Sequence, residues 1–121
     1  MSATHVAWMF ELAVREGREA EFQALMAEMA KATERNEPGT LEYEWFLSAD
    51  GRQVHLWERY ADSAAALTHL KTFGDRFMRR FFDVLAPVRI TIYGAAGEAV
   101  RAAMGDLNPP VMPRAAGFSR H

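Results

Sequence analysis

The chain has 121 residues, of which 50% are hydrophobic and 25% are charged, and its formal net charge is −2 at pH 7. This length suits one globular domain with its own core, and the charge gives no basic surface for nucleic acid or anionic membranes. With no cysteine, the chain excludes disulfides, thiol chemistry and thiolate metal sites, and it suits a reducing compartment. The sequence shows no secretory leader or membrane span, so we expect a cytoplasmic protein.

Alternation of apolar residues between positions 6 and 13 predicts the first strand. Both of its faces are largely apolar, which is typical of a central strand. A helix is expected next, because apolar residues recur at helical spacing between positions 22 and 29 and glutamates occupy the first turn. This helix should end near Asn36, since Pro38 and Gly39 do not readily continue a helix.

Two further alternating stretches, 41–47 and 54–60, flank an Asp-Gly turn signal and predict a β-hairpin. Asp62 or Ser63 is expected to cap the next helix. That helix is predicted to break at Gly74 and Asp75 before it ends at a proline. Positions 88–93 alternate again and predict a fourth strand, and the proline-bearing tail after position 105 is expected to be irregular.

The predicted order β-α-β-β-α-β is that of the ferredoxin-like α+β fold, a four-stranded antiparallel sheet with both helices on one face. We expect residues 1–96 to form this domain and residues 97–121 to add a short helix and an irregular C-terminal tail. No predicted element covers the other sheet face, which carries Met9, His55 and Trp57. An uncovered apolar sheet centre indicates a partner surface, so the sequence predicts a homodimer through this face.

Four motifs link the chain to a known family. They are, in order, Gly17-Arg18-Glu19-Ala20-Glu21-Phe22, Glu37-Pro38-Gly39-Thr40-Leu41-x-Tyr43, Glu58-Arg59-Tyr60-x-Asp62-Ser63 and Ala66-Leu67-x-His69. Together they resemble the antibiotic biosynthesis monooxygenase (ABM) family over residues 5–93. The resemblance implies a dimeric α+β barrel. It also implies one of several activities: cofactor-free oxidation of quinols or polyketide aromatics, haem degradation, isomerisation, or none known.

Branches of the family with different activities differ at particular positions, and this sequence can be compared with them there. The haem-degrading branch uses an Asn on the first strand and a Trp and a His on the second helix, whereas the matching positions here hold Phe10, Leu67 and Phe77. We therefore expect no haem breakdown. The quinol-oxidising branch often has two histidines along the second helix; His69 matches the first, and Gly74 stands at the second position.

Glu58 and His69 are the candidate catalytic residues. Glu58 shares a strand face with Leu56, and His69 lies on or beside the apolar stripe of its helix, so both are expected over one apolar sheet face. An imidazole titrates near neutral pH, and a carboxylate in an apolar pocket is a stronger base than one in water. Each residue also has a structural alternative: His69 as a capping or half-exposed residue, and Glu58 as an arginine-paired or rim carboxylate.

Aromatic and apolar side chains are the candidate substrate-binding residues, because flat rings stack on flat substrates. These candidates are Trp8, Phe10, Tyr43, Leu67 and Phe77. The same side chains also suit plain core or interface packing. His5 and His55 lack metal-ligand spacing, so no metal site is expected, and no flavin or nicotinamide fingerprint predicts a cofactor.

The sequence therefore favours a cofactor-independent monooxygenase that acts on a quinol, a phenol or a similar small aromatic molecule. Two alternatives remain open. One is a non-catalytic dimer that binds a small molecule, and the other is an isomerase of a small hydroxy-carbonyl compound, which needs a base but no oxygen.

Overall fold

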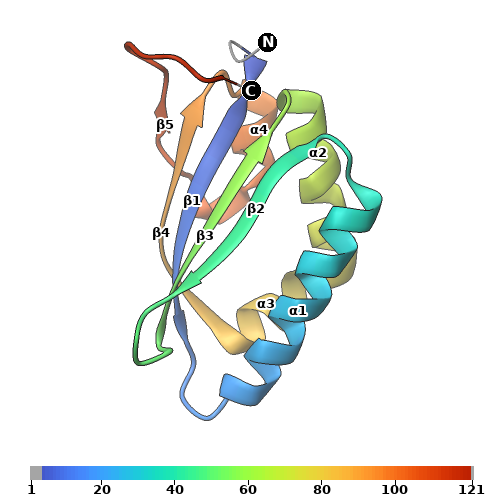
Figure 1. Cartoon of the computed structure of the whole chain (residues 1–121), viewed down its shortest axis with the longest axis vertical. Helices are drawn as coiled ribbons and strands as arrows, with labels where there is room; N and C mark the ends of the chain where they lie inside the picture. Colours follow the sequence, from blue (N-terminus) through green and yellow to red (C-terminus); the bar gives the residue numbers. More distant parts are fainter. Residues whose placement is uncertain (1–3, 121) are drawn as a thin grey trace.

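A computed structural model describes residues 4–120 as one mainly antiparallel sheet with a layer of helices against one face (Figure 1). The strands are β1 (Val6–Val14), β2 (Thr40–Leu47), β3 (Gln53–Tyr60), β4 (Leu85–Gly94) and β5 (Val111–Met112). The helices are α1 (Glu19–Asn36), α2 (Ser63–Thr72), the π-helix η2 (Phe73–Phe77), α3 (Met78–Val84), α4 (Glu98–Ala103) and the 3₁₀-helix η3 (Gly105–Leu107). No helix in this described part is long and apolar enough to cross a membrane.

The central strands are β1 and β3, as the sequence predicts. They pair antiparallel, with Trp8 opposite Glu58, and β4 pairs antiparallel on the other side of β1. The strand order is β2-β3-β1-β4-β5. This arrangement confirms the ferredoxin-like α+β fold and places the inward-facing residues of β1 and β3 at the centre of the sheet.

The number of strands is a correction: the sheet has five strands, not four. The additional strand, β5, runs parallel to β4 and pairs Val111 with Ile92. The backbone N–H of Ile92 also donates to the carbonyl of Pro110 at 3.0 Å. Proline is tolerated at a sheet edge because the side that lacks an N–H can face solvent, while its carbonyl still accepts from the neighbouring strand. The prolines of this tail therefore do not prevent it from extending the sheet.

The second helix also differs from its prediction. Instead of breaking at Gly74 and Asp75, the chain stays helical and widens into the π-helix η2 between α2 and α3. A π-turn takes more residues than an α-turn and so rotates the helix face that follows it. This rotation decides which side chains of η2 and α3 face the sheet.

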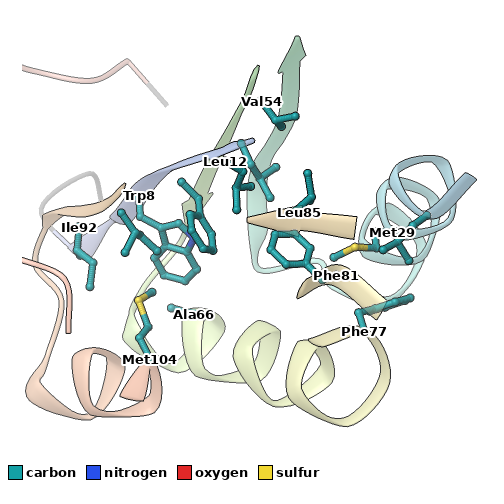
Figure 2. Packing of buried hydrophobic residues seen from close by; sticks show 14 of the residues in the cluster. Trp8, Leu12, Met29, Val54, Ala66, Phe77, Phe81, Leu85, Ile92 and Met104 are labelled. Carbon is teal, nitrogen blue, oxygen red and sulfur yellow. The ribbon is translucent and has the colours of Figure 1, made fainter. Parts of the chain in front are cut away.

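The core lies between the inner sheet face and the helices (Figure 2). Along β1 and β3 every second residue is buried, from Val6 to Leu12 and from Val54 to Tyr60. Phe22, Leu25 and Met29 of α1 pack onto this face. Each such large side chain stabilises the fold by about 1.5–3 kcal/mol relative to exposure. Glu58 is the one carboxylate in the inner rows of β1 and β3, and it is as buried as its apolar neighbours.

The chain beyond β4 packs back onto the helix layer. Val100 of α4 is fully buried, and Met104 and Pro109 are also buried. Arg101 holds the turn that follows, because its side chain donates to the carbonyl of Pro109 at 2.9 Å and to Asn108 Oδ1 at 2.8 Å. This segment is therefore anchored in the core and at the edge of the sheet.

Candidate active site

A cavity of about 600 Å³ lies between the inner sheet face and the helices. This volume is within the usual range for sites that bind small organic molecules. Its floor consists of buried residues: Trp8, Phe10, Met29, Leu56, Glu58, His69, Phe81 and Ile90. Its rim consists of exposed residues: Gly74, Met78, Pro87, Ala103, Gly105 and Asp106. The floor is apolar except for Glu58 and His69, so the polar chemistry is confined to one place.

The start of α2 determines where His69 lies. Asp62 caps this helix, with its side chain accepting from the backbone N–H of Ala65 at 2.8 Å. This bond satisfies one of the backbone donors that every helix leaves free at its N-terminus. From this start the helix buries Ala66 and, one turn later, His69 against the sheet.

His69 bridges two buried carboxylates. Its Nδ1 lies 2.7 Å from Oε1 of Glu37, and its Nε2 lies 3.1 Å from Oε1 of Glu58. The hydroxyl of Tyr60 donates to the same oxygen of Glu58 at 2.5 Å. The four side chains come from three parts of the sequence, namely the end of α1, β3 and α2, and meet inside the protein, where charge-assisted hydrogen bonds are strong. We call Glu37, Glu58, Tyr60 and His69 the buried acid–base cluster.

His69 is a cation at neutral pH in this setting. Burial lowers the pKa of the imidazole, but the hydrogen bonds and charges of Glu37 and Glu58 outweigh burial and raise that pKa to about 9. Both ring nitrogens then carry protons and donate to the two carboxylates. The phenol of Tyr60 stays protonated, because burial and the charge of Glu58 raise its pKa well above the usual value.

Glu37 was not among the residues that the sequence predicted for the site. It follows the last turn of α1, and its Oε1 also accepts from the hydroxyl of Thr40 at 3.0 Å. Gly39 lets this turn approach α2, since a Cβ at Gly39 would lie only 2.7 Å from that of Ala65. The signal in the sequence is the Glu37-Pro38-Gly39 motif. The motif does not indicate that Glu37 contacts His69, which lies 32 residues further along the chain.

Aromatic rings surround His69. The ring centroids of Tyr60, Tyr43 and Trp8 lie 5.4, 5.6 and 6.5 Å from that of the imidazole. Among the described residues, the buried hydroxyl of Tyr43 and the indole N–H of Trp45 have no hydrogen-bond partner of acceptable geometry. Thr33 and Trp45 lie close to the Tyr43 hydroxyl, and burial raises the pKa of that hydroxyl well above its usual value. The imidazolium is therefore shielded from water by rings on several sides.

The structure brings most of the predicted site residues together. Glu58, His69, Trp8, Phe10 and Tyr43 all line the cavity. Leu67 and Phe77 do not line it, although both pack in or against the core. Phe77 instead stacks beneath the guanidinium groups of Arg76 and Arg80. The π-helix η2 accounts for this difference at Phe77, because it turns Phe73, Gly74 and Met78 toward the cavity in its place.

Sequence analysis also missed the contribution of the C-terminal segment. Residues 103–107 line one side of the cavity, with Met104 and Leu107 in the wall and Asp106 at the rim. The described residues contain no group of three or more histidines, cysteines or carboxylates arranged to hold a metal ion. Of the buried acid–base cluster, Glu58 and His69 reach the floor of the cavity.

Comparisons with known proteins agree with this architecture. The family model for antibiotic biosynthesis monooxygenase matches residues 6–84. MupZ from Pseudomonas fluorescens superposes with a TM-score of 0.83 at 24% identity, covering 97% of this chain and 95% of MupZ. Rv0793 from Mycobacterium tuberculosis gives 0.60 at 28% identity, covering 74% and 92% of the two chains.

A third solved structure is SnoaB, a cofactor-independent oxygenase from Streptomyces nogalater. It superposes with a TM-score of 0.65 at 18% identity, covering 78% of this chain and 96% of SnoaB. No curated protein matches the sequence. Because the family model matches well over half of its residues, the chain belongs to the antibiotic biosynthesis monooxygenase family.

Proposed function

We propose that the protein is a cofactor-independent monooxygenase of the ABM type that acts on a phenol, a quinol or a similar small aromatic molecule. The observation that carries this proposal is the buried acid–base cluster at the floor of an otherwise apolar cavity. Family membership supports the reaction class, and the similarity to SnoaB supports chemistry without a cofactor. Fold alone does not fix function, so the cluster is the stronger support.

The cavity binds the aromatic ring and excludes water. Trp8, Phe10 and Tyr43 offer ring surfaces on which a flat substrate stacks. The substrate hydroxyl then lies at the floor, next to Glu58 and His69. In such a dry site, charges interact more strongly than they do in water.

Glu58 is the general base in this proposal. Tyr60 and His69 both contact Oε1 of Glu58, which leaves Oε2 to accept the substrate proton. The resulting substrate anion is rich in electrons and reacts directly with oxygen at a ring carbon that carries a hydrogen, and the proton held by Glu58 then completes the hydroperoxide. Loss of water from the peroxide leaves a carbonyl, so one oxygen atom enters the substrate and the other leaves as water.

His69 and Glu37 act by charge and position. The imidazolium of His69 lies beside the place where negative charge develops and lowers its energy through its positive charge, since both of its N–H groups already donate to Glu37 and Glu58. Glu37 holds the ring through Nδ1 and fixes its orientation. Tyr60 keeps Glu58 in place through the bond to Oε1.

Oxygen uptake by the purified protein tests this proposal. We expect uptake in the presence of hydroquinones or anthrones, measured against the rate without enzyme. Glu58→Gln and His69→Ala should each lower kcat by about 100-fold, because a positioned acid or base contributes that much or more. Glu28→Gln is the matched control, since Glu28 pairs with Arg80 on the surface and does not line the cavity.

The outcome distinguishes the proposal from its alternatives. Turnover without oxygen would overturn the oxygenase and favour an isomerase that uses the same base. Thermal stabilisation by these aromatics without any turnover would favour a binding protein. Equal rates in the parent protein and in both cluster variants would show that Glu58 and His69 do not take part in the reaction.

The assembly and location are part of the proposal. The outer sheet face with Met9, His55 and Trp57 supports a homodimer, because no described element of the chain covers it. A chain without cysteine suits a reducing compartment, so we place the reaction in the cytoplasm.

A further inference from the structure

We propose that the C-terminal segment, residues 98–112, is a wall that selects the substrate. In this wall Met104 and Leu107 limit the size of the ligand, and Asp106 disfavours ligands that carry a negative charge at the rim. The inference rests on the proposed function only in that the cavity is the substrate site. It assigns specificity to residues outside the part of the chain that defines the family, since the family model ends at residue 84.

The segment occupies one side of the cavity. Ala103, Met104, Gly105, Asp106 and Leu107 are consecutive and all line it. In Figure 2 the side chain of Met104 points toward Trp8, which lies on the floor beside His69. A ligand that fills the cavity outward from Glu58 and His69 therefore meets this wall.

The wall is held firmly enough to distinguish ligands by their size. Val100 is fully buried, Pro109 is buried, and β5 pairs with β4. At the other end of the segment, the backbone N–H of Gly97 donates to the hydroxyl of Ser63 at the start of α2, at 3.1 Å. A wall fixed at both ends and in the middle keeps its shape when a ligand binds, which is what size selection requires.

The size limit follows from the volume. A cavity of about 600 Å³ holds a ligand of roughly twenty non-hydrogen atoms, if each atom takes about the volume of a water molecule in the liquid. A quinol with one ring fills less than half of this space. Ligands with several rings extend to Leu107 and Met104, whereas a single ring does not need to reach them.

The charge preference follows from the distribution of carboxylates. Asp106 is exposed at the rim. Glu58 lines the floor, and it and Glu37 flank one imidazolium, so the cluster as a whole is also negative until Glu58 accepts a proton. An anionic ligand therefore meets negative charge at both ends of the cavity, while a neutral ligand or a hydrogen-bond donor does not.

The experiment uses two fluorescent probes with the same ring skeleton. Phenyl-naphthylamine is neutral, and anilinonaphthalene sulfonate adds one negative charge. Leu107→Trp should weaken the binding of phenyl-naphthylamine about tenfold, because the larger side chain takes up space in the cavity that the probe needs. Asp106→Asn should strengthen the binding of the sulfonate about fivefold, as expected for one charge near water, and leave the neutral probe unchanged.

Matched controls separate the wall from general effects on the fold. Leu47→Trp changes an exposed leucine of β2, and Asp83→Asn changes an exposed aspartate of α3; neither residue lines the cavity. Both variants should bind the two probes as the parent protein does. Circular dichroism and thermal melting confirm that each variant is folded before binding is measured.

Activity provides the second measurement. In oxygen uptake, Leu107→Trp should lower kcat/KM for dithranol, an anthrone with three fused rings, about tenfold more than it lowers kcat/KM for hydroquinone. Equal probe affinities in folded Leu107→Trp and the parent protein would contradict the proposal that this wall limits the size of the ligand. If no variant oxidises either compound, the proposed function fails, yet the probe affinities still decide this inference.

Discussion

His69 is a buried cation between two buried carboxylates, an arrangement that costs free energy unless all three groups are paired. Removing charges from water is expensive, and the hydrogen bonds to Glu37 and Glu58 offset that cost. The pKa of His69 records the balance, because the charged form is favoured up to a pH of about 9 despite burial. The protonation of this one residue is therefore coupled to the stability of the fold.

Stability should fall in mildly alkaline solution. The pKa of His69 is about 9 in the folded chain, against an ordinary value of 6.5 when unfolded. The folded state thus binds the proton more tightly, and its contribution is complete below pH 6.5 and is lost as pH rises to 9. Since one pKa unit corresponds to about 1.4 kcal/mol, the free energy of unfolding should fall by about 3 kcal/mol across this range. Urea denaturation at a series of pH values measures it.

A substitution isolates the histidine from other titrating groups. His69→Gln keeps a hydrogen-bonding side chain of similar reach but does not titrate. The difference in unfolding free energy between the parent protein and this variant should therefore shrink as pH rises from 6.5 to 9. A difference that stays constant over this range would show that His69 is not held as a cation by its two carboxylates.

At the scale of single elements, the sequence correctly predicted the strands and the helix cap that depend on the local pattern of residues. Alternation identified the first four strands, and Asp62 was correctly identified as a residue able to cap α2. The π-helix was not predicted, because Gly74 and Asp75 are typical breakers and the local pattern does not show that tertiary packing keeps them helical. The strand β5 was missed for a similar reason, since its adjacent prolines usually indicate irregular chain.

The cap of α2 gives an element-scale prediction. Asp62→Ala removes the acceptor for the N–H of Ala65 and should destabilise the protein by about 1 kcal/mol. Asp62→Asn keeps a side-chain oxygen at the same place and should lower the free energy of unfolding by only a few tenths of a kcal/mol. Urea denaturation compares the two variants. Equal losses in both would indicate that the charge of Asp62, rather than its hydrogen bond, stabilises the helix.

At the scale of the whole molecule, the fold was easier to predict than the site. Glu58 and His69 were found because each lies on an apolar pattern that points it inward. Glu37 was not, because its burial depends on the close approach of Gly39 to α2, which is a tertiary contact. The wall at Met104 and Leu107 depends on how the chain returns after β4, and no local pattern contains that information.

The outer sheet face leads to the prediction for the assembled molecule. Its centre is apolar and aromatic: Met9 and Trp57 are half-buried neighbours across β1 and β3, and Trp57 lies 6.2 Å from Tyr93 between ring centroids. Ion pairs border it, because Arg89 binds Glu11 at 2.7 Å and Arg59 binds Glu42 at 3.0 Å. An apolar centre with a charged rim is typical of protein interfaces.

A symmetric dimer through this face places each Met9 against the same surface of the second copy, so one introduced charge is buried in both copies. Light scattering should give twice the chain mass of 13.6 kDa for the parent protein. Met9→Glu should shift it toward the mass of one chain at micromolar concentration, because the interface cannot solvate the carboxylate. Ala27→Glu adds the same charge at an exposed position of α1 and should leave the dimer intact. A parent protein that has the mass of one chain at every concentration would contradict the dimer and leave the fold and the cavity as described.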